Sequence, residues 1–148
     1  MKVKSNILGA DAIEWLGVHY KTILKAAETG GAISVVDSVS PAGSGPPRHI
    51  HHDADETFVV LSGDARFWVQ GAECTRGPGE TMFIPRGSEH TFRVLSSTPC
   101  RHLVILTPGG FEEFFHEMET GSYRIPEDMV TINECAAHYH MSFTGPPL

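Results

Sequence analysis

Three histidines and one glutamate are spaced so that together they could hold a metal ion. His49 and His51 lie two residues apart, which places both imidazoles on the same face of an extended strand. Glu56 regains that face if the short polar segment 52–55 makes a turn, and His90 can add a fourth ligand from a later strand. This set of nitrogen and oxygen donors contains no thiolate, so it does not favour the cysteine-rich sites of structural zinc.

The segments that carry these residues have the pattern of short strands. Between about residues 13 and 107, apolar and polar side chains alternate in runs that glycine, proline and aspartate interrupt, which is typical of an antiparallel sandwich or barrel. In FVVLSGDARFWV a Gly-Asp turn separates two runs rich in β-branched and aromatic residues, and this predicts a hairpin. The runs that predict strands are 19–26, 32–40, 48–52, 56–61, 65–70, 81–84, 91–95 and 102–107.

After Pro108 the pattern becomes helical. A second helical run is expected from about residue 127 to Met141, after a first helix that Gly121 ends. The first helix has one apolar face, which is formed by Phe111, Phe114, Phe115 and Met118. We therefore expect a single domain over 1–148, with a barrel over about 13–107 and a helical extension over about 108–148 that covers a sheet face or a subunit interface.

Composition and charge narrow the classes of partner. The 148 residues include eighteen acidic and eleven basic ones, which gives a net charge of −7, and no run of Lys or Arg suggests a phosphate track. We therefore expect a small-molecule partner and no nucleic acid. The N-terminus has no continuous apolar stretch, so we expect a cytoplasmic protein without membrane contact. Cys74, Cys100 and Cys135 are odd in number and widely spaced, which favours reduced thiols.

Two blocks of spaced residues resemble the two motifs of the cupin superfamily. Flanking sequences such as GPPRHIHHDADETFVVLSGDARFWVQG are similar to small single-domain cupins related to quercetin dioxygenases, and the resemblance covers nearly the whole chain. One position departs from the pattern, because Val94 stands where the second motif usually ends in asparagine. That position is not a ligand in the family, so the change affects only a polar contact at the strand end. The matching residues are Gly43, His49, His51, Glu56 and Gly63, then Gly79, Pro85, Gly87 and His90.

The resemblance implies a fold and a metal. The fold would be all-β, a double-stranded β-helix or jelly-roll barrel with short C-terminal helices, and the chain would form a homodimer, for which exposed sheet edges give a motive. One divalent transition metal ion per chain would be held by His49, His51, Glu56 and His90. These donors suit iron, manganese, nickel, cobalt, copper or zinc, and they leave one or two positions open for water, dioxygen or substrate.

Strand alternation predicts what surrounds this site. Trp68 should face away from the pocket, toward outside packing or a dimer interface. Four inward-facing residues are expected to line a substrate pocket, although the same residues could form ordinary barrel core. They are Phe58, Val60, Phe67 and Phe92.

Other polar residues are expected to lie outside the metal site. His52 follows His51 directly and should face the opposite way, while Asp53 and Asp55 should be solvated turn residues. Five further histidines have no partner at ligand spacing and are expected to be structural, namely His19, His102, His116, His138 and His140.

The expected function is that of a metal-dependent dioxygenase acting on a small enol or phenol type of substrate, such as a quercetin-like compound. In that reaction Glu56 would either bind the metal or accept the hydroxyl proton of the substrate. Two alternatives use the same site. One is redox-neutral chemistry such as isomerisation, cyclisation, decarboxylation or hydrolysis, and the other is binding of a small molecule without catalysis.

Overall fold

The computed structural model describes residues 7–148 and is built mainly from strands. The helical segments are a short 3-10 turn (Ala26–Thr29), α1 (Glu113–Gly121) and α2 (Met129–His138). The strands are β1 (Ile13–Trp15), β2 (Val18–Leu24), β3 (Ser34–Ser40), β4 (Arg48–His51), β5 (Asp55–Ser62), β6 (Ala65–Val69), β7 (Ala72–Arg76), β8 (Thr81–Ile84), β9 (His90–Val94), β10 (Cys100–Thr107) and β11 (Met141–Gly145).

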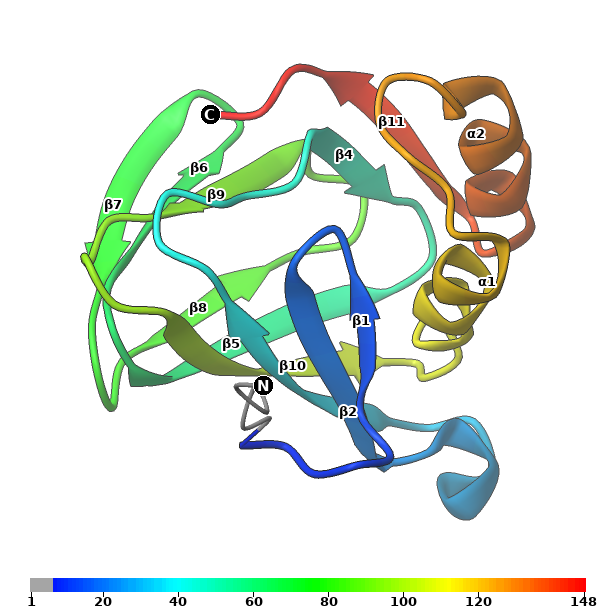
Figure 1. Cartoon of the computed structure of the whole chain (residues 1–148), viewed down its shortest axis with the longest axis horizontal. Coiled ribbons are helices and arrows are strands. Elements are labelled where there is room, and N and C mark those ends of the chain that lie inside the picture. The colour runs from blue at the N-terminus through cyan, green and yellow to red at the C-terminus, as the bar shows by residue number, and fades with distance from the viewer. Residues whose placement is uncertain (1–6) are drawn as a thin grey trace, which may run out of the picture.

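The strands form two antiparallel sheets that face each other (Figure 1). One sheet has the order β1-β2-β3-β10-β5-β8 and the other has the order β11-β4-β9-β6-β7. In β10, buried residues alternate with half-buried ones, as expected for a strand with one face on a core. Two sheets joined by repeated crossovers make the double-stranded β-helix, so the prediction of an all-β jelly roll is confirmed.

The predicted hairpin around Gly63 is wrong. The strands on either side of it, β5 and β6, lie in different sheets, so the turn carries the chain across the barrel. Gly63 has a φ of 79°, and a side chain there would meet the backbone of Pro99 and Cys100 at 2.9 Å. The true hairpin joins β6 to β7 through Gln70 and Gly71, which have φ values of 50° and 84°. Strand β7 was not predicted.

The C-terminal extension is helical only in part. The prediction of a helix to Met141 is wrong, because α2 ends at His138 and His140 has a φ of 56°. Met141 instead begins β11, which pairs with β4 and completes the second sheet. The two helices lie beside this edge of the barrel (Figure 1). They pack there through a second core of Phe114, Met118, Ile132, Ala136 and Met141.

The N-terminal hairpin of β1 and β2 is joined to the same extension. Trp15 donates a hydrogen bond from Nε1 to the carbonyl oxygen of Tyr123 at 2.8 Å, and its ring meets the edge of Phe114. Tyr20 stacks on Phe115 with ring centroids 4.1 Å apart. The N-terminal hairpin therefore packs against the C-terminal extension through these aromatic residues. Within residues 7–148, no helix is long and apolar enough to cross a membrane.

Candidate metal centre

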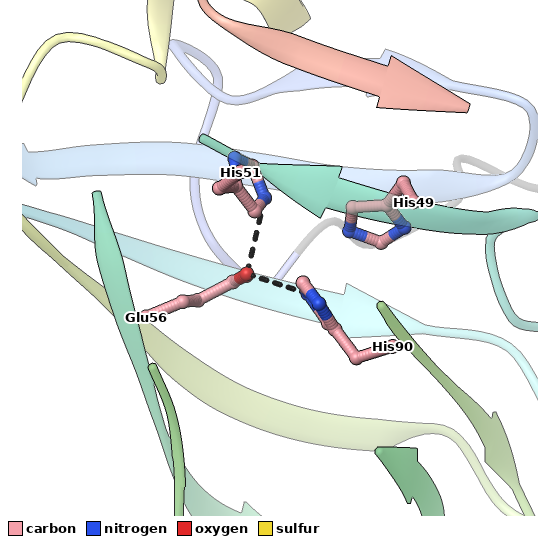
Figure 2. Close-up of side chains that lie close together, drawn as sticks. All are labelled: His49, His51, Glu56 and His90. Carbon is pink, nitrogen blue, oxygen red and sulfur yellow. Dashed lines mark hydrogen bonds and ion pairs between the residues drawn. The ribbon is translucent and has the colours of Figure 1, made fainter. Parts of the chain in front are cut away.

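Three strands bring the four predicted ligands together. His49 and His51 come from β4, Glu56 from β5 and His90 from β9, and one donor atom from each lies within 4.8 Å of all the others. Figure 2 shows the side chains converging from opposite sides of the barrel interior. They are at most 8% exposed, so the cluster is shielded from bulk water.

Backbone carbonyl groups fix the orientation of two imidazoles. Nδ1 of His49 donates to the carbonyl oxygen of Pro47, and Nδ1 of His90 donates to that of Ser88, each at 2.8 Å. A carbonyl oxygen can only accept a hydrogen bond, so both rings carry a proton on Nδ1. In each ring Nε2 is then the nitrogen available to a ligand, as in metal sites where the other nitrogen is held by a supporting contact.

Glu56 is the electrostatic centre of the cluster. Its Oε2 lies 3.1 Å from Nε2 of His51 and 3.0 Å from Nε2 of His90 (Figure 2). Burial alone would raise the pKa of Glu56, but the charges and hydrogen bonds of these two histidines outweigh it and hold the pKa well below its usual range. Glu56 is therefore a carboxylate at neutral pH.

The pKa values of His49 and His90 are shifted in opposite directions. Burial and the neighbouring imidazoles lower the pKa of His49 to about 3, so its ring is neutral. Burial would also lower the pKa of His90, but the hydrogen bond to Glu56 and the charge of Glu56 prevail and raise it. Nε2 of His90 and Oε2 of Glu56 both carry lone pairs, so their 3.0 Å contact needs a cation or a proton between them.

This donor set fits a divalent transition metal ion. Three imidazole nitrogens and one carboxylate oxygen converge within the span of one coordination sphere, and the rings are already turned toward it. The same donors accept several metals, and the availability of the metal in the cell commonly decides among them.

The cluster opens onto an apolar cavity of about 250 Å³. Of the four residues expected to line a substrate pocket, Phe58 and Phe92 line this cavity. Val60 and Phe67 do not line it and belong to the barrel core. The sequence did not show that the C-terminal extension supplies much of the remaining wall. Its contributions include Phe111, Phe114, Phe115 and Phe143.

His102 is a cavity residue that sequence reasoning placed among the structural histidines. Its ring packs against Phe58 and Phe92 with centroids 5.6 and 5.4 Å apart, and its Nε2 lies 3.1 Å from Oγ of Ser40. The alternation of β10 could have revealed it, because His102 shares its inward face with Val104.

The residues next to the ligands take other roles. His52 is exposed, and its Nε2 lies 2.8 Å from Oγ of Ser142, away from the cluster. Asp53 is also exposed. Asp55 is not the solvated turn residue expected, because it begins β5 and pairs with Arg86, whose Nε lies 3.2 Å from its Oδ1. This pair tethers the segment before Glu56 to the loop before His90.

Trp68 and Val94 both lie outside the cluster of candidate ligands and its cavity. Trp68 lies under the guanidinium group of Arg48, with Cζ 4.5 Å from the ring centroid, and it does not line the cavity. Val94 is 2% exposed and belongs to the apolar core. Its backbone bonds to Ser44 and Gly43, so these contacts hold the strand end without an asparagine side chain.

Comparisons with known proteins agree with this architecture. A family model described as a cupin domain matches residues 36–106. Quercetin 2,3-dioxygenase of Bacillus subtilis is 31% identical over 99 residues, which cover 67% of this chain and 29% of that protein. A dimethylsulfoniopropionate lyase of Ruegeria pomeroyi is 41% identical over 54 residues, which cover 36% of this chain and 26% of that protein. The chain thus spans less than a third of the length of either relative.

The likeness to solved structures extends over more of the chain. The crystal structure of ectoine synthase from P. lautus matches with a TM-score of 0.63 and 19% identity, over 80% of this chain and 86% of that one. At this identity the match shows the fold alone. Together with the two motifs, the family match and the two facing sheets, it leads to one conclusion: the chain belongs to the cupin superfamily, as a small cupin that resembles quercetin dioxygenase-like proteins.

Proposed function

We propose that this cupin is a metal-dependent dioxygenase acting on a small aromatic substrate with an enol or phenol group. The observation that carries the proposal is the position of the buried cluster of three histidines and Glu56, which lies on the wall of an aromatic cavity of about 250 Å³. A cavity of this kind favours a flat apolar molecule, and a metal site in its wall favours one with oxygen atoms that can chelate. The name of the Bacillus subtilis relative supports the same class of substrate.

The residues of the chain have separate tasks in this proposal. His49, His51 and His90 would hold the ion, and a bound ion would lower the pKa of a chelated hydroxyl group. Glu56 is a buried carboxylate within reach of that hydroxyl, so it can accept the proton that the substrate loses. The rings of Phe58 and Phe92 exclude water from the substrate.

Oxygen consumption tests this proposal directly. The protein would be loaded separately with iron, manganese, nickel, cobalt or copper and mixed with a catechol, a flavonol and a 1,3-diketone, and dioxygen uptake would be followed with an electrode. We expect uptake with at least one pair of metal and substrate, and its loss in His51→Ala. His52→Ala is the matched control, because this neighbouring imidazole faces Ser142 instead of the cluster. Absence of uptake with every pair would refute the oxygenase.

A redox-neutral enzyme is the second candidate, and the state of Glu56 favours it. A buried carboxylate between two imidazoles can move a proton without any oxidant, as isomerisation, cyclisation, decarboxylation or hydrolysis requires. The lyase name of the Ruegeria pomeroyi relative supports this class. Turnover of a substrate by the zinc-loaded protein in the absence of oxygen would distinguish it from the oxygenase. A cupin that only binds its ligand would show saturable binding and no turnover with either metal form.

We further propose that the protein acts as a cytoplasmic homodimer. The strand β8 supports pairing with a second copy, since it lies at the edge of its sheet and Phe83 on it is 57% exposed. Light scattering coupled to gel filtration would give twice the 16.2 kDa mass of one chain if this is correct. A monomer mass at micromolar concentration would reject it.

A further inference from the structure

The cavity has a second polar region that none of the proposed steps uses. Ser38 and Ser40 on β3 and His102 on β10 all line the cavity, and all are at most 4% exposed. Ser38 lies directly opposite His102 in the pairing of the two strands. Three buried polar side chains thus gather in a cavity whose lining is mainly apolar outside the metal cluster.

Two atoms of this group have no hydrogen-bond partner among residues 7–148. They are Oγ of Ser38 and Nδ1 of His102, whereas Nε2 of His102 lies 3.1 Å from Oγ of Ser40. Buried polar atoms in folded proteins nearly always have a partner, because leaving them unpaired is unfavourable. On the wall of a cavity such a partner can come from the molecule that enters it.

This polar group is distinct from the metal centre but shares its cavity. On β10, Leu106 lies opposite Glu56 and His102 lies opposite Val60, four residues away, which corresponds to about 13 Å along the strand. The rings of Phe58 and Phe92 contact His102 from the direction of the cluster. A molecule that chelates at the cluster and lies along these rings can therefore extend toward Ser38.

We propose that Ser38, Ser40 and His102 form a second recognition site that binds an uncharged hydroxyl or carbonyl group of the substrate. The inference rests on the proposed function insofar as the same cavity receives the substrate. It specifies the substrate class as an aromatic compound that has one chelating end and one further polar group.

The chemistry of the group suits an uncharged partner. Burial lowers the pKa of His102 to about 4, although Glu56 and Asp37 oppose this, so the imidazole is neutral. A neutral imidazole can donate or accept on Nδ1 according to its tautomer, and a serine hydroxyl can do both. A hydroxyl or carbonyl group can thus be satisfied, whereas a carboxylate would find no cation among these three residues.

Two small probes of nearly equal shape can test this inference. Phenol and toluene differ by a hydroxyl in place of a methyl group, and their dissociation constants would be measured by NMR titration of the zinc-loaded full chain. Ser38→Ala should lower the preference for phenol over toluene by about fivefold, the typical value of one neutral hydrogen bond. His102→Phe should lower it similarly while keeping a ring of similar size.

Ser34→Ala supplies a matched control on the same strand. Oγ of Ser34 is also buried and has no partner within the described residues 7–148, but Ser34 does not line the cavity, so its loss should leave the preference unchanged. An equal fall in Ser34→Ala and Ser38→Ala, an unchanged ratio in both cavity variants, or no binding of phenol to the unaltered protein would overturn the inference. Zinc is not redox-active, so these outcomes are independent of oxygen consumption and of whether the chain is an oxygenase.

Discussion

Binding of a metal ion should release a proton from His90. Without an ion, the contact between His90 and Glu56 holds one proton, because Nδ1 of His90 already donates to Ser88. A metal ion needs the same lone pair on Nε2, so it must displace that proton. His49 does not contribute in the neutral range, since its pKa is about 3.

The size and sign of the effect follow from one proton. The pKa of His90 is raised, so its ring remains protonated at a pH where an ordinary histidine is neutral. Below this raised pKa, the metal affinity should fall about tenfold for each unit of pH, which corresponds to about 1.4 kcal/mol per unit. Above it, the contribution of His90 to the pH dependence should disappear.

Calorimetry can count the proton. Zinc or nickel would be titrated near pH 6, below the ordinary pKa of histidine, in two buffers that differ in ionisation enthalpy, and the difference in heat gives the number of protons released. We expect about one in the unaltered protein. In Glu56→Gln the negative charge that raises the pKa of His90 is gone, so proton release should fall toward zero and metal affinity should fall more than about tenfold.

His52→Ala is the control for this experiment, because it removes an imidazole that contacts Ser142 and removes none from the cluster. It should change neither the proton count nor the affinity. A count of zero in the unaltered protein near pH 6, or an unchanged count in Glu56→Gln, would refute the assignment of the shared proton.

Three further predictions concern the framework around the site. In a urea titration, Phe114→Ala should lower the free energy of unfolding by about 3–5 kcal/mol, because Phe114 is 1% exposed. Val130→Ala is the control: this residue is 76% exposed, so the free energy of unfolding should change by less than about 0.5 kcal/mol. Gly45→Ala should cost about 1–3 kcal/mol because the new Cβ would collide with the carbonyl oxygen of Phe92, and an unchanged melting temperature would contradict this. Arg48→Gln should speed amide hydrogen exchange in the last residues, since Nη1 of Arg48 donates to the carbonyl oxygens of two prolines there at 2.7 and 3.1 Å. Equal exchange rates in this variant and the unaltered protein would show that these bonds do not hold the tail.

The sequence pattern predicted an antiparallel sandwich or barrel and the position of the cluster because both depend on local spacing, whereas the jelly roll was implied by the resemblance to cupins. Histidines two apart on a strand share a face whatever the partner strand is, and the structure shows His49 and His51 in this relation. The alternation within β5 likewise marked Phe58 as a residue of the inward face. Such patterns are set by the backbone period and need no knowledge of tertiary contacts.

The pairing of strands could not be predicted in the same way. A glycine turn between two strands is equally compatible with a hairpin and with a crossover, and only the contacts of Gly63 with the backbone at Pro99 and Cys100 distinguish them. Strand β7 was missed because its five residues include only one β-branched residue, Thr75, and no aromatic one, so its composition does not indicate a strand. The role of His102 depends on Ser38 and Ser40, which lie more than sixty residues earlier in the chain.

The division of the cavity wall between segments has a consequence for how such a protein can change. All four candidate metal ligands lie within 36–106, the part that matches the cupin family, whereas Phe111, Phe114, Phe115 and Phe143 come from the segment after it. Substitutions among these phenylalanines would alter which molecules fit the cavity without replacing any of the four candidate donors, whereas the backbone of β11 must be kept because it pairs with β4. Under the proposed function, divergence or engineering of these side chains would therefore change the choice of substrate separately from the residues that would hold the ion.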